Sequence, residues 1–153
     1  MRLKLLRLAV LVAAGALPMG ALVAQASFSA PFLINTTAAQ DSSDNEQPSL
    51  ATDGLGHWVA AWSSDSTLGA TIGRDADILM ARSSNNGSSW TAPAPLNSNA
   101  ATDSGDDIEV RLACDGAGGW VAVWASNDSL GFTVGADYDI LYARSTDNGA
   151  TWG

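Results

Sequence analysis

Four aspartates, arranged as two Asp-x-Asp pairs, are the side chains best suited to chemistry in this sequence: Asp75 with Asp77, and Asp137 with Asp139. Carboxylate oxygens bind hard cations such as calcium, and two carboxylates about 5–10 Å apart can hydrolyse a glycosidic bond. If a strand begins at each pair, both members share one face, because alternate strand residues do. The duplication instead favours a solvated, turn-capping role, since catalysis rarely needs an identical copy. The four aspartates are candidate ligand-binding residues. No cofactor is expected, and too few oxygen ligands are visible to assign a calcium site.

A repeat of 62 residues organises the chain. Shifting the sequence by this length aligns residues 28–91 with 90–153 without a gap, and 32 of the 64 aligned pairs are identical. All six tryptophans fall into register. Large aromatics and turn glycines that recur at one period indicate a supersecondary unit that stacks on copies of itself.

Each unit has a β pattern. In the first unit, strands are expected at 49–53, 58–62 and 77–84, with Trp90 opening a fourth. Asp53-Gly54 supplies the positive φ of a tight hairpin turn. Pro93 and Pro95 restrict the fourth strand to a sheet edge. Four antiparallel strands per unit of about 60 residues is typical of a propeller blade.

Two turn segments, 83–90 and 145–152, end the third strands. Ser145-Thr-Asp-Asn-Gly-Ala-Thr-Trp152 has the pattern Ser-x-Asp-x-Gly-x-Thr-Trp, and the first segment has Asn85 in place of Asp. Asp147 can accept bonds from the N–H groups that follow it, and glycine can take the left-handed conformation. We therefore expect structural turns rather than catalytic or metal-binding carboxylates, formed by Ser83, Asn85, Gly87, Trp90, Ser145, Asp147, Gly149 and Trp152.

These segments resemble the Asp-box, or BNR repeat, of the sialidase-like β-propeller family. The resemblance covers residues 27–153 and implies two four-stranded antiparallel blades of a partial propeller, with unit boundaries at 28–90 and 91–153. It also implies that residues 28–35, which align with 90–97, form an outer fourth strand. Two units cannot close a propeller ring, so the resemblance implies a fragment of a longer propeller or a protomer that assembles.

Catalysis by this chain alone is not expected. Sialidases of this family use three arginines, a tyrosine with a glutamate, an aspartate, and an Arg-Ile-Pro segment that is absent here. After residue 26 only four arginines remain, and Arg82 and Arg144 are repeat equivalents. The single His57 and single Cys114 make a zinc site or a Cys-His nucleophile pair unlikely to form, and a strand position is expected for Cys114.

The first 26 residues resemble a secretory signal. Residues 1–7 are basic, residues 8–23 are apolar, and Ala24-Gln-Ala26 is a cleavage pattern. An uncleaved membrane anchor is the alternative. The formal net charge of −9 disfavours nucleic acid and anionic membrane surfaces as partners. A secreted location, extracellular or periplasmic, follows from these features.

Three functions fit the sequence. The first is an extracellular binding or scaffold module for glycan or protein, which also contacts further blades of the same repeat. The second is the N-terminal part of a sialidase-like glycoside hydrolase, and the third is an inert remnant. The long connections 64–74 and 126–136 could bind or could pack on themselves, and the acidic run 103–107 is expected to be a solvated connector.

Overall fold

The computed structural model describes residues 29–153, so the predicted signal segment lies outside the described residues. Sheet 1 has the strand order β1 (Asn45–Thr52), β2 (Trp58–Ser64), β3 (Asp77–Ser83), β4 (Ala94–Pro95), and sheet 2 has the order β5 (Asp107–Cys114), β6 (Trp120–Ser126), β7 (Asp139–Ser145). All neighbouring strands are antiparallel. The predicted all-β class is confirmed, and the described residues include no helix of the length and apolarity that a membrane crossing requires.

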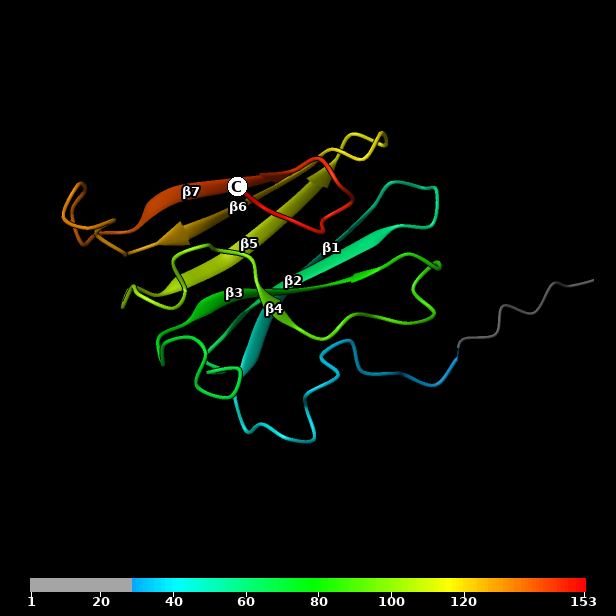
Figure 1. The fold of residues 1–153 in the computed structure, drawn as a ribbon, viewed down its shortest axis with the longest axis horizontal. Coiled ribbons are helices and arrows are strands. Elements are labelled where there is room, and N and C mark those ends of the chain that lie inside the picture. Colours follow the sequence, from blue (N-terminus) through cyan, green and yellow to red (C-terminus); the bar gives the residue numbers. More distant parts are fainter. Residues whose placement is uncertain (1–28) are drawn as a thin grey trace, which may run out of the picture. The chain divides into compact units, whose positions relative to one another are not determined.

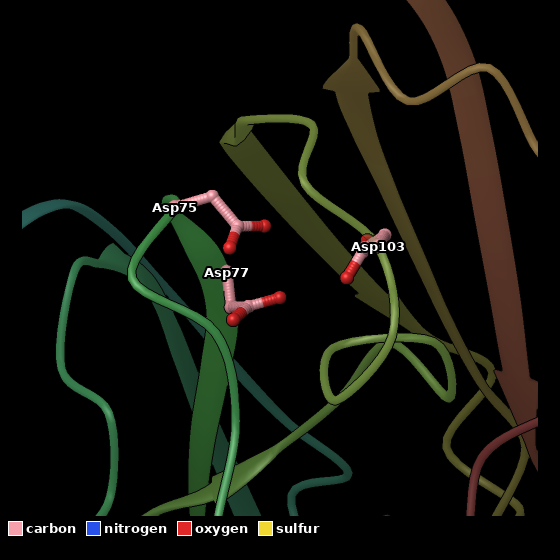
Figure 2. Close-up of side chains that lie close together, drawn as sticks. All are labelled: Asp75, Asp77 and Asp103. Carbon is pink, nitrogen blue, oxygen red and sulfur yellow. The ribbon is translucent and has the colours of Figure 1, made fainter. Parts of the chain in front are cut away.

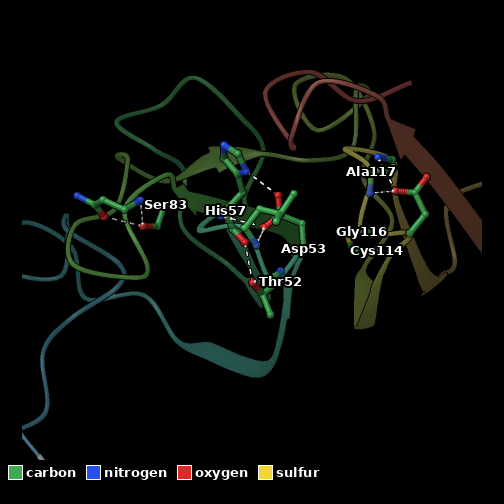
Figure 3. Close-up of polar contacts among 12 residues, drawn as sticks. Thr52, Asp53, His57, Ser83, Cys114, Gly116 and Ala117 are labelled. Carbon is green, nitrogen blue, oxygen red and sulfur yellow. Dashed lines mark hydrogen bonds and ion pairs between the residues drawn. The ribbon is translucent and has the colours of Figure 1, made fainter.

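The hairpin turn between β1 and β2 is built by the side chain of Asp53. Its Oδ1 accepts from the N–H groups of Leu55, at 2.7 Å, and His57, at 3.1 Å, and its Oδ2 lies 2.6 Å from His57 Nδ1 (Figure 3). Gly54 and Gly56 have φ of 74° and 108°, a region that glycine enters without steric cost. The predicted hairpin is thus confirmed.

Sheet 2 repeats this geometry at equivalent positions. Trp58 pairs with Ser83 in sheet 1, and Trp120 pairs with Ser145 in sheet 2. Both first strands also carry an irregularity, where Gln47 and Glu109 have φ of 51° and 60°. The two units therefore fold alike, as the repeat predicts.

The two sheets pack face to face within one unit of the chain, residues 32–153, where β5 contacts β1, β2 and β3 (Figure 1). We call the face of each sheet that bears its β2 or β6 tryptophans the tryptophan face. The tryptophan face of sheet 2 packs on the opposite face of sheet 1, and the shared core consists of Ala61, Ile78, Met80, Leu96, Val110, Ala122, Trp124 and Ala143. Burial of this apolar surface joins the sheets in a head-to-tail order.

Polar bonds between β1 and β5 fix this stacking. The N–H of Glu109 donates to Gln47 Oε1 at 2.8 Å, and the N–H of Leu112 donates to Ser49 Oγ at 3.0 Å. The irregular segments of the two strands therefore supply backbone donors that side chains of the neighbouring sheet satisfy.

The tryptophan face of sheet 1 is covered by the chain's own connections. Ile34, Leu68, Ile72 and Trp90 pack against its buried residues, which include Trp62 and Leu79. The connection 64–74 thus packs on its own sheet. In the connection 126–136, by contrast, Phe132 is 95% exposed.

The opposite face of sheet 2 is exposed. Val121, Val123, Ile140 and Tyr142 present apolar surface there, whereas their repeat equivalents Val59, Ala61, Ile78 and Met80 are buried in sheet 1. We call this exposed surface the open face of sheet 2. It is the surface that a third unit would cover if the stacking continued.

Several details differ from the prediction of two four-stranded blades. Sheet 2 has three strands, since the positions equivalent to β4 fall beyond Gly153. Within the described residues, 29–35 form no strand, so the predicted outer strand there is wrong. Trp90 precedes the fourth strand rather than opening it, and β4 pairs only with Leu79 and Met80. The edge position expected from Pro93 and Pro95 is confirmed.

Candidate functional site

One of the two predicted Asp-x-Asp pairs forms part of a cluster. Asp75 lies just before β3, Asp77 is its first residue, and both meet Asp103 from the segment that precedes β5. One carboxylate oxygen from each of the three lies within 4.8 Å of the others. Figure 2 shows the three side chains directed toward a common space between β3 and that segment. We call them the aspartate cluster.

Asp77 is held at the base of the cluster by an asparagine. Its side chain is fully buried, and Oδ1 accepts from Asn97 Nδ2 at 2.9 Å. Asn97 is itself fixed, because its Oδ1 accepts from the N–H of Ile78 at 3.3 Å. Asp77 Oδ2 has no hydrogen-bond partner among the described residues.

Asp75 is positioned by a glycine two residues earlier. A Cβ on Gly73 would overlap the Asp75 carboxylate, so a side chain at this position would displace it. The N–H of Gly73 donates to the carbonyl of Ala100 at 3.0 Å, which ties the two loops of the cluster together.

Asp103 is braced by a second asparagine. Asn99 Nδ2 donates to Asp103 Oδ2 at 2.7 Å and to Asp128 Oδ2 at 2.9 Å. The expectation that residues 103–107 are a solvated connector is wrong at both ends. Asp103 is half-buried and Asp107 is fully buried, because packing of sheet 2 on sheet 1 covers them.

The crowded carboxylates hold their protons more tightly than usual. Burial, together with the charges of Asp103, Asp75 and Asp107, raises the pKa of Asp77 to about 7. Burial raises the pKa of Asp107 to about 6, and burial with the charge of Asp75 raises the pKa of Asp103. Within residues 29–153 the side-chain ion pair joins His57 to Asp53, so no arginine neutralises the cluster.

The second pair, Asp137 and Asp139, joins no such cluster among the described residues. Asp137 is exposed and Asp139, the first residue of β7, is half-buried. The residue equivalent to Asp103 would follow this pair by 28 positions, beyond Gly153. The cluster is therefore a feature of the junction between two units, not of a single unit.

The geometry narrows what the cluster can do. A sugar cannot approach the fully buried Asp77, so the paired carboxylates do not present a glycosidase site. A bare cation is small enough to enter, and an all-oxygen donor set suits a hard divalent ion.

The second turn segment uses its aspartate internally. Asp147 Oδ1 accepts from the N–H groups of Ala150 and Thr151, at 3.0 and 2.9 Å, and Oδ2 accepts from Thr151 Oγ1 at 2.7 Å. These bonds, with the Thr151 hydroxyl foremost, hold the pKa of Asp147 well below its usual value. Gly149 has φ of 75°, and Trp152 Nε1 donates back to its carbonyl at 3.2 Å.

The first turn segment adopts the same form with an amide. Asn85 Oδ1 accepts from the N–H of Ser89 at 3.0 Å and from Ser83 Oγ at 2.8 Å, as Asp147 Oδ1 does from Ser145 Oγ at 2.7 Å. Asn85 Nδ2 donates to Ser89 Oγ at 2.8 Å, and Gly87 has φ of 77°. Both segments agree with the structural turns expected from the sequence.

The single cysteine and the single histidine lie at equivalent hairpins. Cys114 ends β5, as expected, but it is half-buried, and its Sγ accepts from the N–H of Gly116 at 3.3 Å. His57 contacts Asp53 on the other sheet's turn. They belong to different turns and have no common partner among the described contacts.

Sequence reasoning missed Asn97, Asn99, Asp103 and Asp128. One signal could have found two of them: Asn97 and Asp103 repeat Asn35 and Asp41 at the 62-residue period, inside connectors that otherwise vary.

Comparison with known proteins gives the fold its context. No protein-family model and no curated protein matches the chain. Among solved structures, it is similar to the "Hadza microbial sialidase Hz136", with a TM-score of 0.57 and 15% identity over 79% of this chain and 27% of that one. It is also similar to an N-acetylgalactosamine deacetylase from F. plautii, solved with blood group B trisaccharide, with a TM-score of 0.42 and 12% identity over 69% of this chain and 28% of that one.

The chain thus spans little more than a quarter of the sialidase that it matches. At 15% identity this likeness concerns the fold, and it confirms a sialidase-like arrangement of antiparallel sheets, here with four and three strands. The assignment of the turn segments to the Asp-box repeat stays a prediction.

Proposed function

We propose that this chain is a sialidase-like β-propeller module with a secreted, glycan-related binding or scaffold role, and that it acts as a stack of repeat units. The observation that carries the proposal is the open face of sheet 2. Ile140 is 74% exposed and Tyr142 is 68% exposed, whereas their equivalents Ile78 and Met80 are 0% and 6% exposed beneath the neighbouring sheet. A contiguous apolar sheet face of this kind marks an interaction surface.

A second copy of the chain fits that surface. The tryptophan face of sheet 1 exposes Leu50 by 53%, while its equivalent Leu112 packs into the shared core. A copy stacked in the same head-to-tail order would place its Leu50 against the open face, as Leu112 now lies against sheet 1. The interface would repeat the one that already joins the two sheets.

The N-terminal segment of that copy would supply the missing strand. Phe32 and Leu33 are the repeat equivalents of β4, and they are 85% and 67% exposed. The edge of β7 at Leu141 and Tyr142 corresponds to the edge of β3 that β4 covers. An unpaired strand edge is a template for another chain, so a second copy could complete sheet 2.

Self-association tests the stacking. The double variant Ile140→Lys/Tyr142→Lys blocks the open face, and Leu50→Lys blocks the tryptophan face of sheet 1. We expect sedimentation velocity to show concentration-dependent association of the unmodified chain, and monomers for each variant alone. Mixing the two variants should restore a one-to-one complex, because each retains the face that the other has lost.

Phe132→Lys is the matched control. Phe132 is 95% exposed, and its equivalent Ala70 also stays exposed although sheet 1 is covered, so this variant should associate normally. Monomers of the unmodified chain at every concentration would contradict a second copy as the occupant. If the chain then associates only with a longer product of the same repeat, the occupant is a further unit of a parent protein.

The glycan-related role rests on the likeness to the sialidase fold and has its own test. We expect the purified chain to bind immobilised sialylated or galactosaminylated glycans without hydrolysing them. The alternative is that the chain is the N-terminal part of a sialidase-like glycoside hydrolase, which the same likeness favours. Release of the fluorophore from a fluorogenic sialoside by this chain would support the hydrolase and contradict the scaffold.

A further inference from the structure

The aspartate cluster contains three buried oxygens that nothing satisfies. Asp75 Oδ2, Asp77 Oδ2 and Asp103 Oδ1 are each inaccessible to solvent and have no hydrogen-bond partner among the described residues. Each carboxylate contributes one of these oxygens. We infer that Asp75, Asp77 and Asp103 form a divalent-cation site, best suited to Ca²⁺, at the junction of the two repeat units.

The first reason is the burial of Asp77. Its side chain is 0% exposed, and Oδ2 is unsatisfied while Oδ1 is held by Asn97. A buried carboxylate without a partner is costly, and buried charges are normally paired or bound to a metal. An acidic group on a solvated loop would carry no such implication, so Asp77 separates this cluster from the chain's other acids.

The second reason is that the remaining oxygens are already engaged. Asn97 and Asn99 donate to the other oxygens of Asp77 and Asp103 at 2.9 and 2.7 Å. Gly73 leaves the space that Asp75 occupies. These contacts orient the unsatisfied oxygens toward one another, as outer contacts orient the ligands of metal sites.

The third reason is electrostatic. Three carboxylates share one small volume, and no basic side chain neutralises them within residues 29–153. The raised pKa of Asp77 and of Asp103 records the same repulsion. A divalent cation would offset most of the negative charge.

The donor set favours calcium over other metals. All three protein ligands are oxygens, which excludes the nitrogen and sulfur ligation that zinc and copper prefer. Ca²⁺ accepts six to eight oxygens in flexible geometry, so water can supply the remainder. Mg²⁺ demands stricter octahedral geometry and should bind more weakly.

The second unit provides an internal comparison. Asp137 and Asp139 repeat the Asp75 and Asp77 pair, but no equivalent of Asp103 meets them in this chain. We therefore expect one Ca²⁺ per chain. This inference does not depend on self-association or on glycan binding, because all three ligands come from one chain.

Calorimetric titration of metal-free chain with CaCl₂ tests the site. We expect one bound ion per chain, weaker binding of MgCl₂, and a thermal unfolding midpoint that rises with Ca²⁺ concentration because the ion binds only the folded chain. Asp103→Asn should weaken binding by about 10–100-fold, in the range found for disturbed metal sites. Asp139→Asn, at the matched position of the second unit, should bind as the unmodified chain does.

Asp75→Asn is a second variant in case Asp103→Asn does not fold, because Asp75 lies in a loop and makes fewer bonds. It should also lose Ca²⁺ binding while keeping the β-sheet circular dichroism spectrum. The inference is overturned if the unmodified chain neither binds Ca²⁺ nor gains thermal stability from it. It is equally overturned if binding survives both substitutions, or if Asp139→Asn removes it.

Discussion

Sheets 1 and 2 are built from nearly the same residues but differ in what surrounds them. In sheet 1 the face bearing Ile78 is covered by sheet 2, while in sheet 2 the face bearing Ile140 is open. The strand pairing is nevertheless the same, residue for residue, in the two β-hairpins and in the strands that follow them. Strand pairing in this fold is therefore a property of the unit, whereas core formation is a property of the junction.

The same contrast holds for the two Asp-x-Asp pairs. Asp77 is fully buried and braced by Asn97, which comes from the connector between the units. Asp139 has no such connector after it in this chain and remains half-buried. Identical residues thus become a candidate site in one unit only, because the third side chain comes from the next unit.

The largest predicted effect separates Ile78 from Ile140. Ile78→Ala removes a fully buried side chain from the core between the sheets and should lower the free energy of unfolding by about 2–5 kcal/mol. Ile140→Ala at the equivalent position, 74% exposed, should change it by about 0.5 kcal/mol or less in the monomer. Urea denaturation at low protein concentration measures both.

Equal losses from these two variants would show that the open face is covered in solution even when the protein is dilute. A loss for Ile140→Ala that grows with protein concentration would instead be the expected sign of self-association, because assembly stabilises the folded chain by mass action.

The strands and turns could be predicted from the sequence because their causes are local. Alternation of apolar residues at 58–62 and the Asp53-Gly54 turn specify a hairpin without reference to the rest of the molecule. The short β4 shows the limit of such reasoning. Pro93 and Pro95 predict an edge strand, but its pairing with only Leu79 and Met80 depends on the chain turning away to begin the next unit.

The aspartate cluster was predictable only in part. The pair Asp75 and Asp77 stands out by type and spacing, but Asp103 lies 26 residues after Asp77 in a connector that resembles a solvated loop. Its position follows from stacking of the two sheets, which brings the start of β5 beside the start of β3. Residues 29–35 failed as a strand for the same reason, since no preceding unit pairs with them in this chain.

The next effect in size separates two glycines. Gly149 has φ of 75°, and a Cβ there would lie 2.6 Å from Val59 Cγ2 in sheet 1. Gly149→Ala should therefore cost about 2–4 kcal/mol, from backbone strain and overpacking together. Gly87→Ala has a similar φ of 77° but comes no closer than 3.9 Å to Trp90, so only the strain of about 1–2 kcal/mol applies.

Thermal unfolding of both glycine variants measures this difference, and their shared strain makes each the control for the other. A Gly149→Ala variant no less stable than Gly87→Ala would mean that Val59 yields to the added methyl group. The contact would then contribute little to the fit between the second turn segment and sheet 1.

The smallest effect, and the one most specific to the turns, depends on pH. Asp147 has a pKa well below the usual value of 3.8, so its bonds to Thr151 and Ser145 stabilise the folded chain at neutral pH. That contribution is complete above about pH 4, where the unfolded chain is also ionised, and it is lost as pH falls through the folded-state pKa. Asp147→Asn should thus be less stable than the unmodified chain at pH 7, and the difference should shrink steadily below about pH 4.

Asn85→Asp is the reciprocal change in the first turn segment. Ser89 Oγ, which now accepts from Asn85 Nδ2, can rotate its hydrogen to donate to the new carboxylate, as Thr151 does to Asp147. Charge-assisted bonds are roughly twice as strong as neutral ones, so this variant should gain up to about 1 kcal/mol at pH 7 and acquire the same loss in acid. Unfolding measured in urea between pH 2.5 and 7 would decide the matter. If Asn85→Asp lowers stability at pH 7, the two turns differ in more than the charge of one side chain, and the equivalence of the units would end at this position.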